Sequence, residues 1–553
     1  MAAIPPPKTQ PAPDSAATVG VVRSAGLMSA AVMVSRITGL AREIIMARLF
    51  GASSEFDAFR LGFTLPNLTR DLFAEGALSS AFVPTFTEYL TNKTKQDAAR
   101  LVNLVATAVI LLVGLLCLLG MAGAPLLVDL FAPGFRQVPG KAELAIHLTR
   151  IMFPFLLLVA LAAQVMGVLN ACNQFGVPAL ASSMFNVGSV LAGLALGFWL
   201  GAFLGLTPIE GMAWGVVVGG ATQLAWQVPS LYRKGFAFRP AIDWNDPGLR
   251  HIIYLMGPAL LGGAAVQINI LVNTNFASYI QDPLRGPNGP VSWLGWAFRF
   301  MQLPLGLFGV AVASATLPAI SRSLASGNHE EFRRTLSRSL GVVFLLTVPS
   351  SIGLAVLGVD MIRAIYEGGR FDAYDTRQTA LALSCYAIGL VGYSGVKVLN
   401  PAFYALRDSR TPMLVSLASI AINFLAATAT LHYTSLGHAG LALSASVVAL
   451  SSFLLLFWIL RNKIGGIYGR DLAASTGKMA LASLFMGVVV AMLQLGTASW
   501  LGTSRMASAF TLALCIPAGL AMFYAACRAL RITELDLAVT GLASPLSRLW
   551  GRL

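Results

Sequence analysis

Fourteen long apolar stretches divide this chain of 553 residues. Each holds about 20 residues or more, the length that an α-helix needs to cross the hydrocarbon core of a bilayer. Only 11% of the residues are charged and the mean hydropathy is +0.73, whereas soluble domains carry about 25% charged residues. The sequence therefore predicts an all-α polytopic membrane protein with about 14 transmembrane helices. The predicted spans lie near residues 24–50, 57–89, 101–132, 143–172, 177–203, 209–232, 250–280, 291–321, 336–366, 378–404, 411–432, 438–460, 476–500 and 507–529.

The distribution of lysine and arginine predicts the orientation of these spans. With the N-terminus in the cytoplasm, 23 of the 38 basic residues fall in cytoplasmic segments or at the span edges that adjoin them, 6 in outer loops and 9 within spans. This excess on the cytoplasmic side follows the positive-inside rule, so both termini are expected in the cytoplasm. The same pattern explains the net charge of +14, because the basic residues form short clusters between apolar runs. Nucleic-acid binding is therefore not needed to explain the charge.

Two proline landmarks recur at nearly the same spacing. Pro304 lies 238 residues after Pro66, and Pro412 lies 234 residues after Pro178. Six spans separate the copies, so both halves enter the membrane from the same side, which predicts a parallel repeat. The expected parts are a six-helix lobe at 23–235, a second six-helix lobe at 236–470 and two additional helices at 471–532.

Polar segments precede and follow the predicted spans. Residues 1–22 are rich in Pro and Ala and lack the apolar region of a secretory signal peptide. They predict a disordered cytoplasmic tail. Residues 533–553 are expected to form a second cytoplasmic tail.

Four arginines lie inside stretches that are otherwise apolar enough to cross a bilayer, at Arg36, Arg42, Arg70 and Arg299. An arginine at the centre of a span costs at least about 2.5 kcal/mol, so it is retained where it faces water, a carboxylate or an anionic ligand. Three of the four fall in the first two spans. The pattern predicts an internal cationic cavity, and such a cavity predicts an anionic cargo.

The first span places polar side chains at helical spacing. Ser35 and Arg42 are seven residues apart and share a helix face, as do Arg36 and Glu43. We assign Ser35 to the substrate-binding set with the arginines, and Glu43 to coupling or gating. The alternative for Glu43 is a structural ion pair with Arg36 inside the helix bundle.

Further charged residues are candidates for coupling or gating. Arg70 and Glu75 follow the break at Pro66 and are placed to line a cavity. Asp57 lies near the outer end of the second span, where a surface ion pair with Arg60 is the simpler interpretation. Lys397 lies inside the tenth span, where snorkelling to the cytoplasmic face is an equal alternative to a functional role.

Catalytic and metal-binding patterns are absent from the sequence. There is no H-E-x-x-H, no P-loop and no glycine-rich nucleotide fingerprint. The five cysteines and five histidines show no metal-ligand spacing. We therefore predict a transporter and not an enzyme, without a metal or cofactor, which draws its energy from a gradient or a partner.

The chain carries five motifs with fixed spacing: Ser35-Arg36-x-x-Gly39-x-x-Arg42, Leu65-Pro66-Asn67-Leu68-x-Arg70-x-x-Phe73-Ala74-Glu75-Gly76-Ala77, Ala81-Phe82-Val83-Pro84, Glu367-x-Gly369-x-Phe371 and Pro401-x-Phe403-Tyr404-Ala405-x-x-Asp408-x-x-Thr411-Pro412. Together these motifs resemble the MurJ (MviN) family of bacterial lipid II flippases. The resemblance runs from about residue 24 to 530, and the Phe-Ala-Glu-Gly-Ala stretch is its most specific part.

The resemblance implies the MOP exporter fold, in which two six-helix lobes enclose a central cavity and two extra helices form a lipid groove. It implies alternating access, with lipid II moved from the cytoplasmic to the outer leaflet of the bacterial inner membrane. The implied roles are in peptidoglycan synthesis, cell-wall biogenesis and cell shape. The implied partners are lipid II, membrane lipids and cell-wall synthesis proteins.

The family's functional residues map onto this chain with two departures. The cavity arginines correspond to Arg36, Arg42, Arg70 and Arg299, and the required acid corresponds to Asp57. Some members carry an acid beside the arginine of the eighth span, where this chain has a phenylalanine at 298. Some members also use an acidic sodium site in the C-terminal lobe, but the seventh span here has no carboxylate; its polar residues are Gln267, Asn269 and Asn273.

Two alternatives differ from this interpretation. A drug exporter or another polysaccharide-lipid exporter of the same superfamily would share the fold, and a paired acid in a C-terminal span would favour drug efflux. A membrane enzyme acting on polyprenyl lipids would need a carboxylate or histidine cluster at the membrane surface. Neither feature is evident in the sequence.

Overall fold

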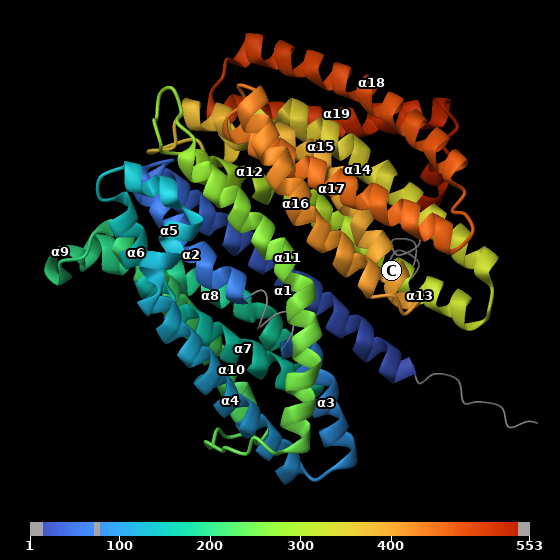
Figure 1. Cartoon of the computed structure of the whole chain (residues 1–553). Coiled ribbons are helices and arrows are strands. Elements are labelled where there is room, and N and C mark those ends of the chain that lie inside the picture. The colour runs from blue at the N-terminus through green and yellow to red at the C-terminus, as the bar shows by residue number, and fades with distance from the viewer. Residues whose placement is uncertain (1–14, 71–77, 540–553) are drawn as a thin grey trace, which may run out of the picture. The chain divides into compact units, whose positions relative to one another are not determined.

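The computed structural model of the chain describes residues 15–70 and 78–539, and these residues are helical with no β-strand (Figure 1). Two isolated β-bridges, Asp282 with Gly286 and Gly368 with Phe371, occur in loops. Within the described residues, each of the fourteen predicted spans coincides with one helix or with consecutive helices. The prediction of an all-α polytopic protein is confirmed.

The helices up to residue 233 are short or interrupted in several places. They are α1 (Ser15–Phe50), α2 (Ser54–Arg70), α3 (Ser79–Asn92), α4 (Lys95–Ala122), α5 (Ala124–Phe131), the 3₁₀-helix η2 (Pro133–Gln137), α6 (Lys141–Met152), α7 (Pro154–Ala171), α8 (Gly176–Leu194), the π-helix η3 (Ala195–Trp199), α9 (Gly201–Leu204) and α10 (Pro208–Arg233).

The helices after residue 246 are mostly long. They are α11 (Pro247–Tyr279), α12 (Pro290–Pro304), the π-helix η4 (Leu305–Val310), α13 (Ala311–Ala325), α14 (His329–Ile365), α15 (Ala373–Ala405), α16 (Arg410–Tyr433), α17 (His438–Lys463), α18 (Gly469–Leu501) and α19 (Arg505–Ala529).

Ten helical segments in the described part of the chain are long and apolar enough to cross a membrane. The other four predicted spans coincide with α1, with α2 and α3 taken together, with α10, and with α11. α1 carries Arg36, Arg42, Glu43 and Arg48, and α2 is only 17 residues long. The count of fourteen spans therefore stays a prediction.

The chain folds as two compact units whose segments alternate along the sequence. The first unit consists of residues up to 45, 62–124 and 146–260. The second unit consists of residues 46–61, 125–145 and 261 onward. The domain boundaries predicted from the repeat stay a prediction.

In the first unit, α10 packs along α7 and α8, and α4 packs along α7. Phe82 and Phe86 stack with ring centroids 5.3 Å apart, and Phe236 meets Phe86 edge-on at 5.7 Å. The buried Gln164 side chain donates to the carbonyl of Val102 at 2.8 Å. Such side-chain hydrogen bonds hold helices together inside a bilayer, where burial of apolar surface does not.

In the second unit, α15 packs against α14 and α17, while α18 and α19 form a pair that lies on α14. These helices are drawn in yellow, orange and red in Figure 1. A polar cluster joins α14 to the pair: Asp360 accepts from Gln494 Nε2 and from Ser508 Oγ, each at 2.6 Å. The two additional helices are thus fixed to α14 through one buried carboxylate.

Pro304, Gly306 and Gly309 predict a broken helix in the eighth span, and the structure shows the form of this break. α12 ends at Pro304, and η4 continues the helix with π-helical hydrogen bonding before α13 begins. Proline lacks the N–H that an α-helical hydrogen bond requires, so the pattern changes there. In the second span, Pro66 lies inside α2, and Gly76 lies outside the described residues.

Two glycines allow the end of α1 to contact the loop before α15 within the second unit. Gly51 and Gly369 both have positive φ, at 57° and 61°. A Cβ on Gly51 would overlap the carbonyl oxygen of Arg370, and a Cβ on Gly369 would overlap that of Arg48. The Arg370 amide also donates to the Arg48 carbonyl at 2.8 Å. These positions therefore require glycine.

The turn between α15 and α16 is closed by one carboxylate. Asp408 accepts from Lys463 Nζ at 2.7 Å, from the Thr411 hydroxyl at 2.7 Å and from the Thr411 amide at 3.0 Å. These donors hold the pKa of Asp408 well below its usual range. The turn therefore carries a charged carboxylate at neutral pH, which positions the start of α16.

Candidate substrate-binding and gating site

α1 holds its two intramembrane arginines in different surroundings. The Arg42 guanidinium lies 3.3 Å from Glu43 and above the rings of Phe63 and Phe185, at 5.5 and 5.2 Å from their centroids. The ion pair and the two aromatic faces orient the guanidinium. The side chain of Arg36 is exposed. In the described part of the chain Glu43 pairs with Arg42, so the alternative of an Arg36–Glu43 pair is wrong.

A buried asparagine joins α8 to α1 beside these arginines. Asn186 Nδ2 lies 3.3 Å from both the Ser35 carbonyl oxygen and Thr38 Oγ1. The Thr38 hydroxyl donates to the same carbonyl at 3.1 Å. The sequence interpretation overlooked Asn186; a polar residue inside an apolar span was the available signal. Ser35 thus contacts α8 through its backbone, and its role in binding stays a prediction.

The other candidate residues are distributed over both units. Arg70, in the last turn of α2, belongs to the first unit with Arg36 and Arg42, whereas Arg299 on α12 belongs to the second. Glu75 lies outside the described residues. Lys397 lies on α15 with its side chain exposed. The convergence of the four arginines on one cavity stays a prediction.

Asp57 and Lys141 form a fully buried ion pair in the second unit. Lys141 Nζ lies 2.9 Å from Asp57 Oδ2, and both side chains have no exposed surface. The ammonium also donates to the Pro287 carbonyl and to Asn288 Oδ1, each at 3.0 Å, and lies above the Phe135 ring. Three acceptors therefore satisfy the three N–H bonds of the lysine.

Asp57 also binds the beginning of α12. Its carboxylate accepts from the Gly289 and Ser292 amides at 2.9 and 3.1 Å, and from the Ser292 hydroxyl at 2.5 Å. A carboxylate is stabilised at a helix N-terminus, where backbone N–H groups lack partners. The predicted surface ion pair between Asp57 and Arg60 is wrong, because α6 supplies a buried lysine 84 residues away in sequence.

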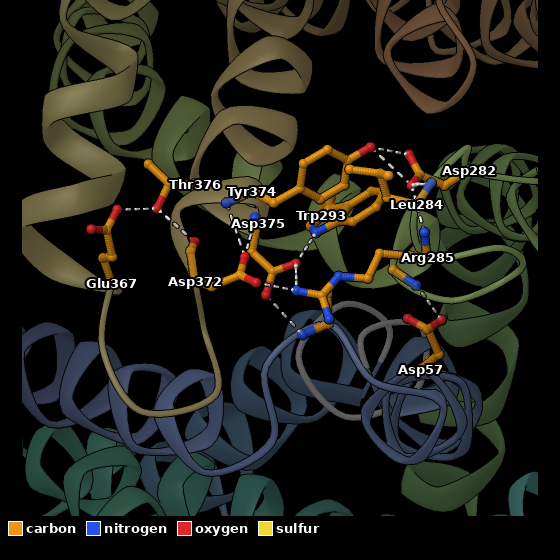
Figure 2. A network of polar contacts seen from close by, with 12 residues as sticks. Asp57, Asp282, Leu284, Arg285, Trp293, Glu367, Asp372, Tyr374, Asp375 and Thr376 are labelled. Atoms are coloured by element: carbon orange, nitrogen blue, oxygen red, sulfur yellow. Dashed lines mark hydrogen bonds and ion pairs between the residues drawn. The ribbon is translucent and has the colours of Figure 1, made fainter.

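A second carboxylate extends this network, as Figure 2 shows. The buried Asp375 accepts from Trp293 Nε1 at 3.0 Å and from the Ala52 amide at 3.4 Å. Arg285 joins it, with Nη2 3.6 Å from Asp375 and 2.5 Å from Asp372. We name the residues Asp57, Lys141, Arg285, Ser292, Trp293 and Asp375 the Asp57 network. It connects α2 and α6 with α12, α15 and the loop before α12.

Neutral polar side chains of α11, α16 and α17 contact one another in the second unit. Asn423 donates to Asn273 Oδ1 at 3.0 Å and accepts from the Ser444 hydroxyl at 3.3 Å, while Asn269 donates to Ser419 at 2.9 Å. No group of three His, Cys, Asp or Glu side chains able to hold a metal ion occurs among the described residues. An amide that directs its N–H groups into the cluster does not fit a cation site.

The fold and these polar sites are those of a polytopic helical membrane protein. The structure is similar in fold to an inward-facing multidrug resistance MATE family transporter of the MOP superfamily, with a TM-score of 0.65 and 15% identity, covering 79% of this chain and 98% of the other. It is also similar to a lipid II flippase MurJ in an inward closed conformation, with a TM-score of 0.72 and 26% identity, covering 91% and 99%.

Sequence comparison identifies the family. The family described as lipid II flippase MurJ matches residues 46–511. The lipid II flippase MurJ of Burkholderia cenocepacia is 36% identical over 443 residues, covering 79% of this chain and 82% of the relative. A probable lipid II flippase MurJ of Vibrio cholerae is 33% identical over 532 residues, covering 94% and 97%. The chain belongs to the MurJ family.

Proposed function

We propose that this protein moves lipid II, the undecaprenyl-diphosphate-linked precursor of peptidoglycan, from the cytoplasmic to the outer leaflet of the bacterial inner membrane. The observation that carries the proposal is the set of intramembrane arginines in a chain that belongs to the MurJ family. Arginine binds phosphate by charge-assisted, often bidentate hydrogen bonds. A diphosphate that leaves water needs such partners, because burying an unpaired charge is very unfavourable.

The proposed mechanism is alternating access without a covalent step. Arg36, Arg42, Arg70 and Arg299 bind the diphosphate while the polyprenyl tail stays in the bilayer along α18 and α19. The Asp57 network, which the predicted topology places at the outer side, closes that side in one state and opens in the other. Its ion pair and its carboxylate at the start of α12 give this closure discrete, breakable contacts.

The test of the function is leaflet-resolved detection of lipid II in cells depleted of this protein. An impermeant enzyme that cleaves the lipid II head group reports the fraction in the outer leaflet. Depletion is expected to leave lipid II uncleaved and to raise its total amount. Unchanged cleavage in depleted cells that contain no second flippase would contradict the proposal.

The orientation of the chain is predicted from its basic residues, with both termini in the cytoplasm. Gly140 and Gly465 are exposed, and they lie in loops that the prediction assigns to opposite sides of the membrane. Reporter fusions truncated at Gly140 should report the outer side, and fusions at Gly465 the cytoplasm, because of the 23-to-6 charge asymmetry. The reverse pattern would refute the topology.

The source of energy is predicted from the seventh predicted span, whose sequence contains no Asp or Glu. Replacing sodium by choline should change the flipping rate in vesicles by less than about twofold, because this span offers no carboxylate to bind the cation. Collapsing the membrane potential should stop flipping, since each unit charge that moves across 100 mV is worth about 2.3 kcal/mol. Flipping that persists without a potential, or that stops without sodium, would show this prediction to be wrong.

A further inference from the structure

The accessible face of α2 carries an arginine besides Arg70. After the first turn of α2, the described side chains that are not buried recur at helical spacing; they are Arg60, Phe63, Thr64, Asn67 and Arg70. On an ideal helix these positions lie within about 120° of one another. They therefore form a single stripe, on which Arg60 lies about 15 Å from Arg70 along the helix axis.

The Arg60 guanidinium lies against Gly295 of α12. A Cβ added to Gly295 would overlap the carbon and two nitrogens of the Arg60 guanidinium. The guanidinium thus occupies the space that any other residue at 295 would fill. Its charge also acts on the hydroxyl of Tyr386, which packs edge-on against Phe298 at 5.4 Å. All of these residues belong to the second unit.

α12 has an accessible stripe of its own at this contact. Between Val291 and Leu303, the side chains are buried except at Gly295, Phe298, Arg299, Gln302 and Leu303. Gly295 and Arg299 are four residues apart, so they lie on one helix face, with Cβ positions about 6 Å apart. A helical side chain leans toward the N-terminus, which directs Arg299 toward the position of Arg60.

The Arg60 guanidinium of α2 lies against the same accessible face of α12 that carries Arg299, and two arginines at one place in a membrane span point to an anionic ligand. We propose that Arg60 is a further substrate-positioning residue that binds the diphosphate of the lipid carrier together with Arg299. The inference rests on the proposed function. It also explains why position 295 is glycine, since only glycine leaves room for the guanidinium against α12.

The test uses the full-length protein in nanodiscs, with undecaprenyl diphosphate as the probe. Arg60→Gln should weaken binding about tenfold, because a charge-assisted hydrogen bond is lost. Arg100→Gln is the matched control with the same change of charge; Arg100 is an exposed residue paired with Asp243 at 2.9 Å. The control should bind as tightly as the wild type. A weakening by Arg60→Gln of less than about threefold would overturn the inference.

A double-mutant cycle separates positioning from packing. Gly295→Ala displaces the Arg60 guanidinium without changing the charge, so it should weaken binding by about as much as Arg60→Ala does. In the Arg60→Ala background, Gly295→Ala should have less than about a twofold further effect. An equal loss from Gly295→Ala in both backgrounds would assign the glycine to helix packing and would refute the pairing with Arg60.

The outcome also distinguishes this inference from the proposed function. A wild-type protein that does not bind undecaprenyl diphosphate would refute the function itself. Tight binding by both the wild type and Arg60→Gln would refute only the role of Arg60.

Discussion

Replacing Arg42 by alanine is expected to abolish lipid II flipping while the protein accumulates normally in the membrane. The same result is expected for Arg36→Ala, Arg70→Ala and Arg299→Ala. Each substitution removes one charged hydrogen-bond donor. Part of the diphosphate is then left unpaired in a site away from water. Growth of cells that rely on the variant as their only flippase measures function, and immunoblots of membranes measure the amount of protein.

Lysine should restore only part of the activity at Arg42. The guanidinium lies between two aromatic rings and beside Glu43, and a compact ammonium does not reproduce its planar array of donors. The alternative is that Arg42 stabilises the bundle by neutralising Glu43. That alternative predicts degradation of Arg42→Ala and recovery in the Arg42→Ala/Glu43→Gln double variant. Normal growth with alanine at three or more of the four sites would refute the cationic cavity.

Replacing Lys141 by methionine is expected to have the largest effect on stability. The substitution leaves the carboxylate of Asp57 buried without its positive partner, a change that costs about 3–5 kcal/mol in buried ion pairs. We expect a clear drop in the thermal unfolding midpoint of the purified protein and loss of flipping. The exposed Lys478 provides the control, and Lys478→Met should leave the midpoint unchanged.

A double substitution tests whether the unpaired charge of Asp57 causes the loss of stability in Lys141→Met. In Asp57→Asn/Lys141→Met both charges are gone, and the single amide oxygen of the asparagine can still accept from the Ser292 amide at the start of α12. More than half of the lost stability should return. Flipping should not return if the ion pair is part of the outer closure. A double variant as unstable as Lys141→Met would attribute the effect to packing around Phe135 instead.

The helices of this protein were predictable because a bilayer imposes length and polarity on each span. The positions of all fourteen apolar stretches coincide with helices, and the break predicted near Pro304 appears as η4. Both features depend on residues that are close in sequence. Hydropathy and proline chemistry act locally, so their effect on helix formation can be predicted without the tertiary structure.

The partners of the charged residues were not predictable in the same way. The sequence places Lys141 in an outer loop, but the fold buries it against Asp57, 84 residues earlier. Asn186 meets α1 across 151 residues, and Trp293 meets Asp375 across 82. Each pair depends on which helices become neighbours, which hydropathy does not specify. Arg60 was assigned to a surface ion pair for the same reason.

The π-helical stretch η4 changes the direction in which the side chains after it point relative to those before it. Residues 290–325 form one continuous span of 36 residues. A helical wheel drawn through it at a constant 100° per residue fails at η4, because π-helical turns hold more residues than α-helical ones. Beyond Val310 the wheel is out of phase by about one residue. Side chains of α13 that share a calculated face with Arg299 therefore point in a different direction, and a helix of uniform pitch is the wrong template for reading this span.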